Sequence, residues 1–145
     1  MSEQYWLRVH GYPGQLDAEV VYYGDFFDLA TGQRLSSDPC KNLCPGDILI
    51  YFADGPGSVY GVATVTGEVE GPFSDVRRGQ VWRVPIKREA IIRAVNKAPH
   101  AGWMEPPSGR HFLAVVRDYT YIRLPENDGL YLIDQVKARV SARES

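Results

Sequence analysis

Aromatic side chains with basic neighbours are the groups in this sequence best suited to contact a ligand. The 145 residues include nine tyrosines and three tryptophans, which combine an apolar ring with a polar atom. Trp103 lies in the segment 99–109, where three prolines and two glycines exclude regular structure, and loops often carry binding residues. Its ring either folds onto the core or covers a ligand. Beside Arg110, such a ring is suited to stacking on a nucleobase whose phosphate the arginine holds.

Groups for catalysis or metal binding are few. His10, His100 and His111 lack the i, i+4 spacing of a helical metal site, and no nucleophile elbow, Walker loop or dinucleotide fingerprint is present. We therefore expect no metal, no cofactor and no catalytic residue. Cys40 and Cys44 have no second pair of ligands, so we expect reduced thiols first, a disulfide second and a metal site third.

Charge is segregated along the chain. Residues 1–76 contain three basic and eleven acidic residues, a net charge of −8, and residues 77–145 contain thirteen basic and seven acidic residues, a net charge of +6. The sum is the −2 of the whole chain, which argues against indiscriminate coating of nucleic acid. The basic half is either an ordinary solvated surface or a face for a polyanion. Four arginines are the candidate phosphate contacts: Arg77, Arg78, Arg88 and Arg110.

Hydrophobic patterns predict a β-rich protein. The segment 46–67 is expected to form a hairpin that turns at residues 54–57, and Gly61 within it indicates a bulge, a bend or a close approach. Further strands are expected at 4–10, 18–23, 80–86, 112–117 and 119–124, and helices at 36–43, 87–97 and 130–140. Asp118 leaves little room for a hairpin, so 112–117 and 119–124 are either two strands or one bent strand. This order predicts a single α+β domain over residues 1–145, a small, partly open barrel of about six or seven strands with two or three short helices.

The first strand has two unlike faces. Trp6, Arg8 and His10 alternate with Tyr5, Leu7 and Val9 along it. The face with Trp6 lines either a polar pocket or the outside of the barrel.

Three segments together resemble the EVE domain and the wider PUA-like group, which includes the PUA, ASCH, YTH and SRA domains. They are YWLRV, GDILIYFADGPGSVYGVATVTGEVEGPF and VWRVPIKREAIIRAV. The resemblance implies a mixed β pseudobarrel with a cavity that binds a modified base of DNA or RNA. By position, the implied pocket residues are His10, Tyr12, Phe52, Ala53 and Asp54, with Trp103 as a lid. Trp6 joins the candidate pocket from its face of the first strand. The chain departs from the family where RVHGYP replaces the usual lysine or serine, glutamate, proline turn.

We therefore expect a non-enzymatic reader of a modified base, such as methylated or hydroxymethylated cytosine. One alternative is an ASCH-like amidohydrolase acting on modified nucleosides, although Lys41, Lys87, Lys97 and Lys137 all lie outside the implied pocket. Another alternative is a protein-interaction module, and the charge split also permits a homodimer. No apolar run approaches the roughly 20 residues that cross a bilayer, so we expect a cytoplasmic protein without a membrane segment.

Overall fold

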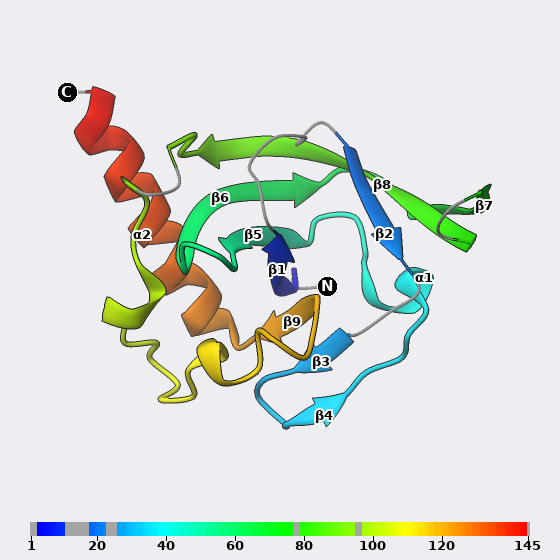
Figure 1. The fold of residues 1–145 in the computed structure, drawn as a ribbon, viewed down its shortest axis with the longest axis horizontal. Coiled ribbons are helices and arrows are strands. Elements are labelled where there is room, and N and C mark those ends of the chain that lie inside the picture. The colour runs from blue at the N-terminus through cyan, green and yellow to red at the C-terminus, as the bar shows by residue number, and fades with distance from the viewer. Residues whose placement is uncertain (1–2, 11–17, 23–25, 77–78, 95–96, 145) are drawn as a thin grey trace.

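Nine strands form one mixed sheet within the part of the chain that the computed structural model describes, residues 3–10, 18–22, 26–76, 79–94 and 97–144 (Figure 1). The strands are β1 (Tyr5–His10), β2 (Ala18–Tyr22), β3 (Phe26–Asp28), β4 (Gln33–Arg34), β5 (Ile48–Ala53), β6 (Ser58–Val65), β7 (Glu70–Asp75), β8 (Gly79–Ile91) and β9 (Tyr121–Leu124). The helices are α1 (Pro39–Asn42) and α2 (Glu126–Glu144), and 3₁₀ turns span Ala101–Trp103 and Phe112–Ala114.

The strand order is β2-β8-β6-β5-β1-β9-β3-β4, and β7 pairs with β8. An α+β fold is thus confirmed. The prediction of six or seven strands is wrong, because β3 and β4 have only three and two residues and the β7 segment lacks a clear period of two. The sheet is also open, with β2 and β4 at the ends of the path, rather than a pseudobarrel.

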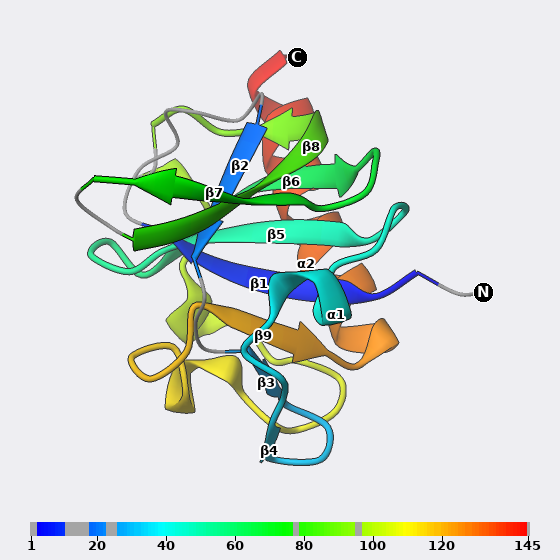
Figure 2. The same ribbon diagram turned by 90° about the vertical axis from the view of Figure 1, so that its right-hand side faces the viewer.

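The central strands are covered on both faces. In Figure 2, β6, β5, β1 and β9 lie side by side, with α2 behind them and β2 in front, and Figure 1 shows α2 and β2 on opposite sides of the sheet. Contacts of α2 with β1, β5 and β6 agree with this arrangement. Tyr5, Trp6, Leu7 and Arg8 are therefore all buried, and the predicted contrast between the two faces of β1 is absent.

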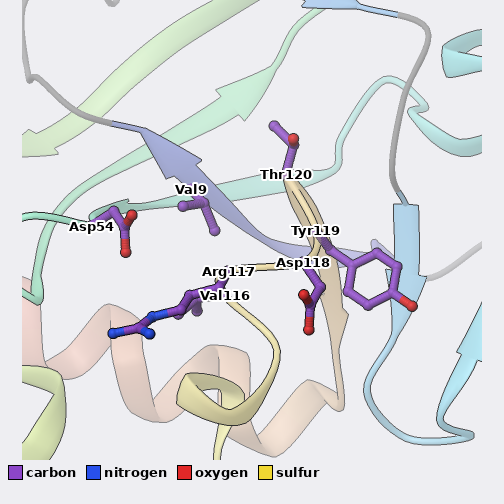
Figure 3. A pocket seen from close by; sticks show the side chains of 7 residues that line it. All are labelled: Val9, Asp54, Val116, Arg117, Asp118, Tyr119 and Thr120. Carbon is purple, nitrogen blue, oxygen red and sulfur yellow. The ribbon is translucent and has the colours of Figure 1, made fainter.

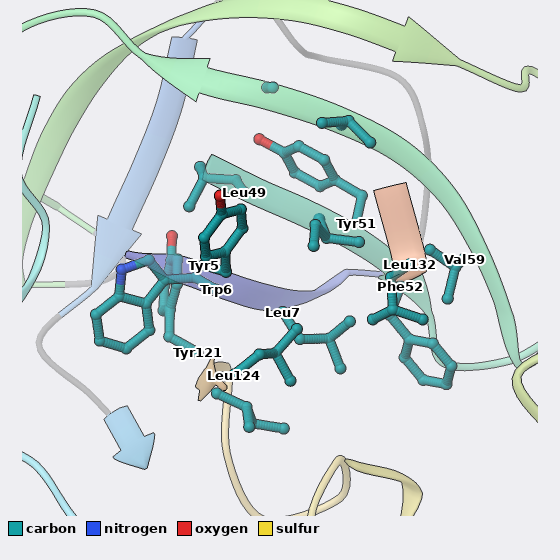
Figure 4. Close-up of a cluster of buried hydrophobic side chains, with 14 of the residues drawn as sticks. Tyr5, Trp6, Leu7, Leu49, Tyr51, Phe52, Val59, Tyr121, Leu124 and Leu132 are labelled. Carbon is teal, nitrogen blue, oxygen red and sulfur yellow. The ribbon is translucent and has the colours of Figure 1, made fainter. Parts of the chain in front are cut away.

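Trp6 is the largest fully buried side chain of the core (Figure 4). Its Nε1–H donates a hydrogen bond to Oδ2 of Asp47 over 3.1 Å. The ring also meets Phe26 edge to face, with centroids 5.7 Å apart. An indole with its one donor satisfied is stable in an apolar interior, so Trp6 is a core residue.

The predicted hairpin is confirmed as β5 and β6. Gly57 has a φ of +72°, and its N–H donates to the carbonyl of Ala53 over 2.8 Å, which closes the turn. The β5–β6 register shifts where Tyr51 pairs with Gly61 and Phe52 pairs with Val59. A Cβ on Gly61 would lie 2.8 Å from Cδ1 of Ile91, so the glycine serves both a bulge and the close approach of β8.

The helix predicted over 87–97 is wrong, since residues 87–91 continue β8. The first part of this long strand pairs with β2 and β7, and the second part pairs with β6. Pro85 lies at the change of partner, where it pairs with Ala18. The proline therefore sits at the end of one ladder, where its missing N–H is tolerated.

Both remaining helix predictions are confirmed. Asp38 caps α1 by accepting a hydrogen bond from the N–H of Cys40 over 3.0 Å. Helix α2 exceeds the predicted 130–140 at both ends and buries Leu132 and Val136 against the sheet. None of the helices among the described residues is long and apolar enough to cross a membrane.

The strand predicted over 112–117 is wrong, and that predicted over 119–124 is confirmed only for Tyr121–Leu124. Nδ1 of His111 accepts a hydrogen bond from the N–H of Leu113 and so starts a 3₁₀ turn. Phe112 and Val116 are buried four residues apart, which is a helical rather than an alternating pattern.

Candidate functional site

A cleft of about 680 Å³ lies where β1 and β5 end (Figure 3). These strands are parallel, and their last pair is His10 with Ala53, so their carboxyl ends meet at one edge of the sheet. The other wall is the segment before β9, held to β1 by a hydrogen bond from the N–H of Val9 to the carbonyl of Thr120 over 2.9 Å. The volume is within the range of small-molecule sites. The lining residues are Val9, Asp54, Val116, Arg117, Asp118, Tyr119 and Thr120.

Charged side chains at the cleft are exposed and of mixed sign. Asp54 directly follows β5 and begins the turn that Gly57 closes, so its carboxylate is placed by the hairpin. Arg117 and Asp118 extend from the opposite wall. In Figure 3, Asp54 and Arg117 lie at one end of the cleft, and Asp118 lies at the other. Two carboxylates and one guanidinium suit a ligand that presents hydrogen-bond donors better than a bare phosphate.

The one aromatic ring of the described lining is already engaged elsewhere. Tyr119 stacks on Phe27 with centroids 4.3 Å apart, and the guanidinium of Arg34 lies 5.6 Å from the Tyr119 centroid. This ring therefore fixes the wall of the cleft against β3 and β4. The described walls offer polar groups and no free aromatic face.

The structure separates the residues predicted for the pocket. Among the predicted residues that the structure describes, Asp54 alone lines the cleft. Trp6, Phe52 and Ala53 are buried in the core and are not available to a ligand. Phe52 lies on the face of the sheet that the Phe112 turn covers, and the two ring centroids are 5.8 Å apart. Trp6 and Ala53 lie on the opposite face, where the Trp6 ring packs against Phe26. The side chain of His10 and the whole of Tyr12 lie outside the described residues.

Trp103 is 87% exposed and does not line the cleft. It lies close to it, however, because the N–H of Ala101 donates to the carbonyl of Gly57 over 2.8 Å. The Trp103 turn therefore packs on the turn that begins at Asp54. The predicted lid is a neighbour of the cleft in this structure.

Two of the four predicted phosphate contacts, Arg88 and Arg110, lie among the described residues. Arg77 and Arg78 lie outside the described residues. Arg88 is exposed on β8 opposite Ala63. Arg110 donates to the carbonyls of Leu29 and Ala30 over 3.3 and 2.6 Å, so it ties two loops together. Neither Arg88 nor Arg110 lines the cleft.

The sequence reasoning missed Arg117, Asp118 and Thr120. The sequence predicted two strands or one bent strand here, since Asp118 leaves little room for a hairpin, and it did not predict an exposed turn. A charged pair between two apolar runs is itself a sign of an exposed connection.

The two histidines with described side chains, His100 and His111, have structural roles, and both cysteines are free thiols. His100 and His111 each begin a 3₁₀ turn, and Nε2 of His111 is bonded to the carbonyl of Ala101 over 3.0 Å. Cys40 and Cys44 are free, as expected. Burial, with nearby carboxylates, raises the pKa of both thiols, which disfavours the reactive thiolate. Over the described ranges, no cluster of three or more histidine, cysteine, aspartate or glutamate residues could hold a metal ion.

Comparison with known proteins shows the fold alone. No family model matches this chain, and no curated protein matches its sequence. A solved structure of a hypothetical protein from Leishmania major has a TM-score of 0.56 and 10% identity, over 95% of this chain and 97% of that one. The NMR structure of Rpa0253 from Rhodopseudomonas palustris has a TM-score of 0.55 and 12% identity, over 93% of this chain and 94% of that one. The architecture is thus shared along nearly the whole length of both proteins.

Proposed function

We propose that the protein is an EVE-like, PUA-like domain that binds a nucleic-acid base turned out of its stack, in the cleft between the ends of β1 and β5 and the segment before β9. One observation carries the proposal: an open cleft lies at the carboxyl ends of these strands with Asp54 on its rim. This is where the resemblance to EVE domains implies a base pocket. Cytosine or a methylated or hydroxymethylated cytosine is the proposed ligand, in DNA or RNA.

Recognition in this cleft depends on the polar edge of the base. Cytosine presents its N4 amino group as a donor, whereas thymine and uracil present O4, an acceptor, at the same position. A carboxylate accepts hydrogen bonds and donates none when ionised. Asp54 therefore favours an amino-bearing base over thymine or uracil. Turning a base out costs a few kcal/mol, and enclosure in the cleft offsets this cost.

The ASCH-like amidohydrolase alternative has less support. Thr120 is a hydroxyl at the cleft, but no lysine is among the described residues that line it. A nucleophile of this kind needs an adjacent base or a lowered pKa. Turnover of N4-acylated cytidine, followed by ultraviolet absorbance, would favour this alternative.

Binding of short single-stranded oligonucleotides at low salt tests the proposal. The central base is cytosine, 5-methylcytosine, 5-hydroxymethylcytosine or uracil, and fluorescence anisotropy gives Kd. We expect at least one cytosine form to bind about 5- to 140-fold more tightly than uracil, the range expected for one good base contact. Asp54→Asn should remove this preference, because an amide both donates and accepts.

Asp134→Asn is the matched control, since it removes the same charge from an exposed position on α2. It should leave the preference unchanged. Absence of binding to every oligonucleotide, or the same preference in Asp54→Asn as in the unsubstituted protein, would contradict the proposal.

A further inference from the structure

The most exposed aromatic ring among the described residues does not line the cleft. Trp103 is 87% exposed, whereas Trp6 and Trp82 are at most 5% exposed. The backbone around Trp103 is nonetheless well held. Its N–H donates to the carbonyl of His100, and the N–H of Met104 donates to the carbonyl of Ala101, each over 3.1 Å. Ala101 and Met104 are buried, so a fixed turn presents the indole to solvent.

The segment that carries Trp103 runs along the start of β6 toward the cleft. The N–H of Val59 donates to the carbonyl of Pro99 over 3.0 Å, and Ser58 forms a bridge with His100. Ala101 then bonds to Gly57, which closes the turn that begins with Asp54. The backbone that carries Trp103 therefore packs beside the turn at the rim of the cleft.

Positive charge lies at the other end of the same segment. Lys97 and Arg139 are both exposed, and Nη1 of Arg139 donates to the carbonyl of Lys97 over 3.1 Å. Six residues of extended chain span at most about 20 Å, so Lys97 lies within a few nucleotides of Trp103. The surface thus presents, in order, two cations, one exposed indole and the carboxylate rim of the cleft.

We propose that Lys97, Arg139 and Trp103 bind the single strand that flanks the base held in the cleft. This inference rests on the proposed function. Trp103 stacks on a neighbouring base, and the two cations contact phosphates. The two carboxylates at the cleft, Asp54 and Asp118, outnumber its one guanidinium, that of Arg117. The cleft is therefore unfavourable for phosphates, and Lys97 and Arg139 supply cations away from it. Stacking and phosphate contact depend little on sequence, so this surface adds affinity and the cleft adds selectivity.

Intrinsic tryptophan fluorescence gives a direct readout, because Trp103 is the one exposed tryptophan of the three. An oligonucleotide of about eight residues with one central cytosine should quench it, and cytidine alone should not. Trp103→Ala should weaken oligonucleotide binding by about 5- to 140-fold, the range for losing one stacked base, without changing the preference for cytosine over uracil.

Salt dependence tests the two cations. The slope of log K against log salt is negative. Lys97→Ala and Arg139→Ala should each make it shallower by about 0.7, the value per phosphate contact on a single strand. Lys137→Ala is the matched control, because it removes one positive charge from a different face of α2. Its slope should equal that of the unsubstituted protein, and circular dichroism should show all four variants folded.

The outcomes separate the two proposals. If cytosine-selective binding persists and Trp103→Ala has the affinity of the unsubstituted protein, the flanking-strand surface is refuted and the cleft proposal stands. If neither oligonucleotide nor cytidine binds, both proposals fail. If Trp103→Ala instead abolishes self-association in sedimentation experiments and leaves nucleic-acid affinity unchanged, the surface is a protein interface and the inference is overturned.

Discussion

Replacing Asp47 by alanine should destabilise the protein strongly, although no ligand is proposed to touch this residue. Asp47 is 2% exposed. Its carboxylate accepts four hydrogen bonds, from the backbone N–H groups of Gln4 and Cys44, the side-chain amide of Gln4 and the indole of Trp6, all at 3.0 to 3.1 Å. The substitution therefore leaves several donors at the start of β1 without this acceptor.

The expected loss is about 3–5 kcal/mol of unfolding free energy. One hydrogen bond to a charged group contributes about 1.5–3 kcal/mol, and a buried donor left unpaired costs about 1–3 kcal/mol. Bonds that share one carboxylate do not add, so the total lies well below four separate bonds. A protein with 5–15 kcal/mol of stability, the usual range, still folds after this loss.

Urea unfolding followed by circular dichroism measures the loss, and a double-mutant cycle assigns it. Trp6→Phe keeps most of the ring volume and removes the indole N–H. Trp6→Phe should lower the free energy of unfolding less in the Asp47→Ala background than in the unsubstituted protein, because Asp47→Ala has already removed the hydrogen bond between the two residues. A loss below 1 kcal/mol for Asp47→Ala, or strict additivity in the cycle, would refute the assignment of Trp6 to a hydrogen-bonded core.

Three further substitutions test local features. Gly129→Ala should lower the free energy of unfolding, measured in urea, by about 1–3 kcal/mol through overpacking, because the new Cβ would lie 2.5 Å from Cγ of Tyr5. Gly55→Ala is the control, since its new Cβ would have nothing within 4 Å, and it should change stability little. Equal effects of the two substitutions would contradict this reasoning. Burial alone would raise the pKa of Asp28. Hydrogen bonds to its carboxylate, above all the one from Arg123, outweigh burial and hold the pKa below the ordinary value. The folded protein then binds fewer protons here than the unfolded chain, so this stabilisation is present above about pH 4 and lost as pH falls. The stability gap between the unsubstituted protein and Asp28→Asn should shrink below pH 4, and a constant gap would contradict the pKa assignment.

The sequence predicted best those elements that depend on near neighbours. The β5–β6 hairpin needs only two β-rich runs and a turn that ends in a glycine with positive φ. The cap of α1 needs only Asp38 and the following proline. Such signals lie within a few residues of the structure they specify, so a single sequence is enough to find them.

The false helix at 87–97 has a specific physical cause. Val62 pairs with Ala90, and Ala63 pairs with Arg88, so Glu89 is the extra residue of a bulge. The bulge leaves Lys87, Arg88 and Glu89 exposed between buried Ile86 and Ala90. Buried positions four apart are typical of a helix, and only the pairing with β6 shows that this segment is a strand.

Of the residues predicted for the pocket, the structure places Asp54 at the cleft and Trp6, Phe52 and Ala53 in the core. The parallel pairing of β1 with β5 brings Val9 and Asp54 together at the cleft, and Val9 was not predicted as a pocket residue. The burial of Trp6 depends on a hydrogen bond to Asp47, 41 positions away. The second wall of the cleft depends on the turn before β9. Contacts of this kind follow from the tertiary structure and leave no local pattern in the sequence.

Burial of the aromatic residues also changes how a base would be recognised. Trp6, Tyr51, Tyr60 and Tyr121 fill the core, and Tyr119 stacks on Phe27. These rings stabilise the sheet, so the high aromatic content is not evidence of an aromatic cage. If a nucleic acid binds, selectivity must come from the polar edge at Asp54, and stacking must come from outside the cleft, where Trp103 is the exposed ring of the adjoining turn. The Asp54→Asn and Trp103→Ala variants should therefore fail differently, one in selectivity and the other in affinity.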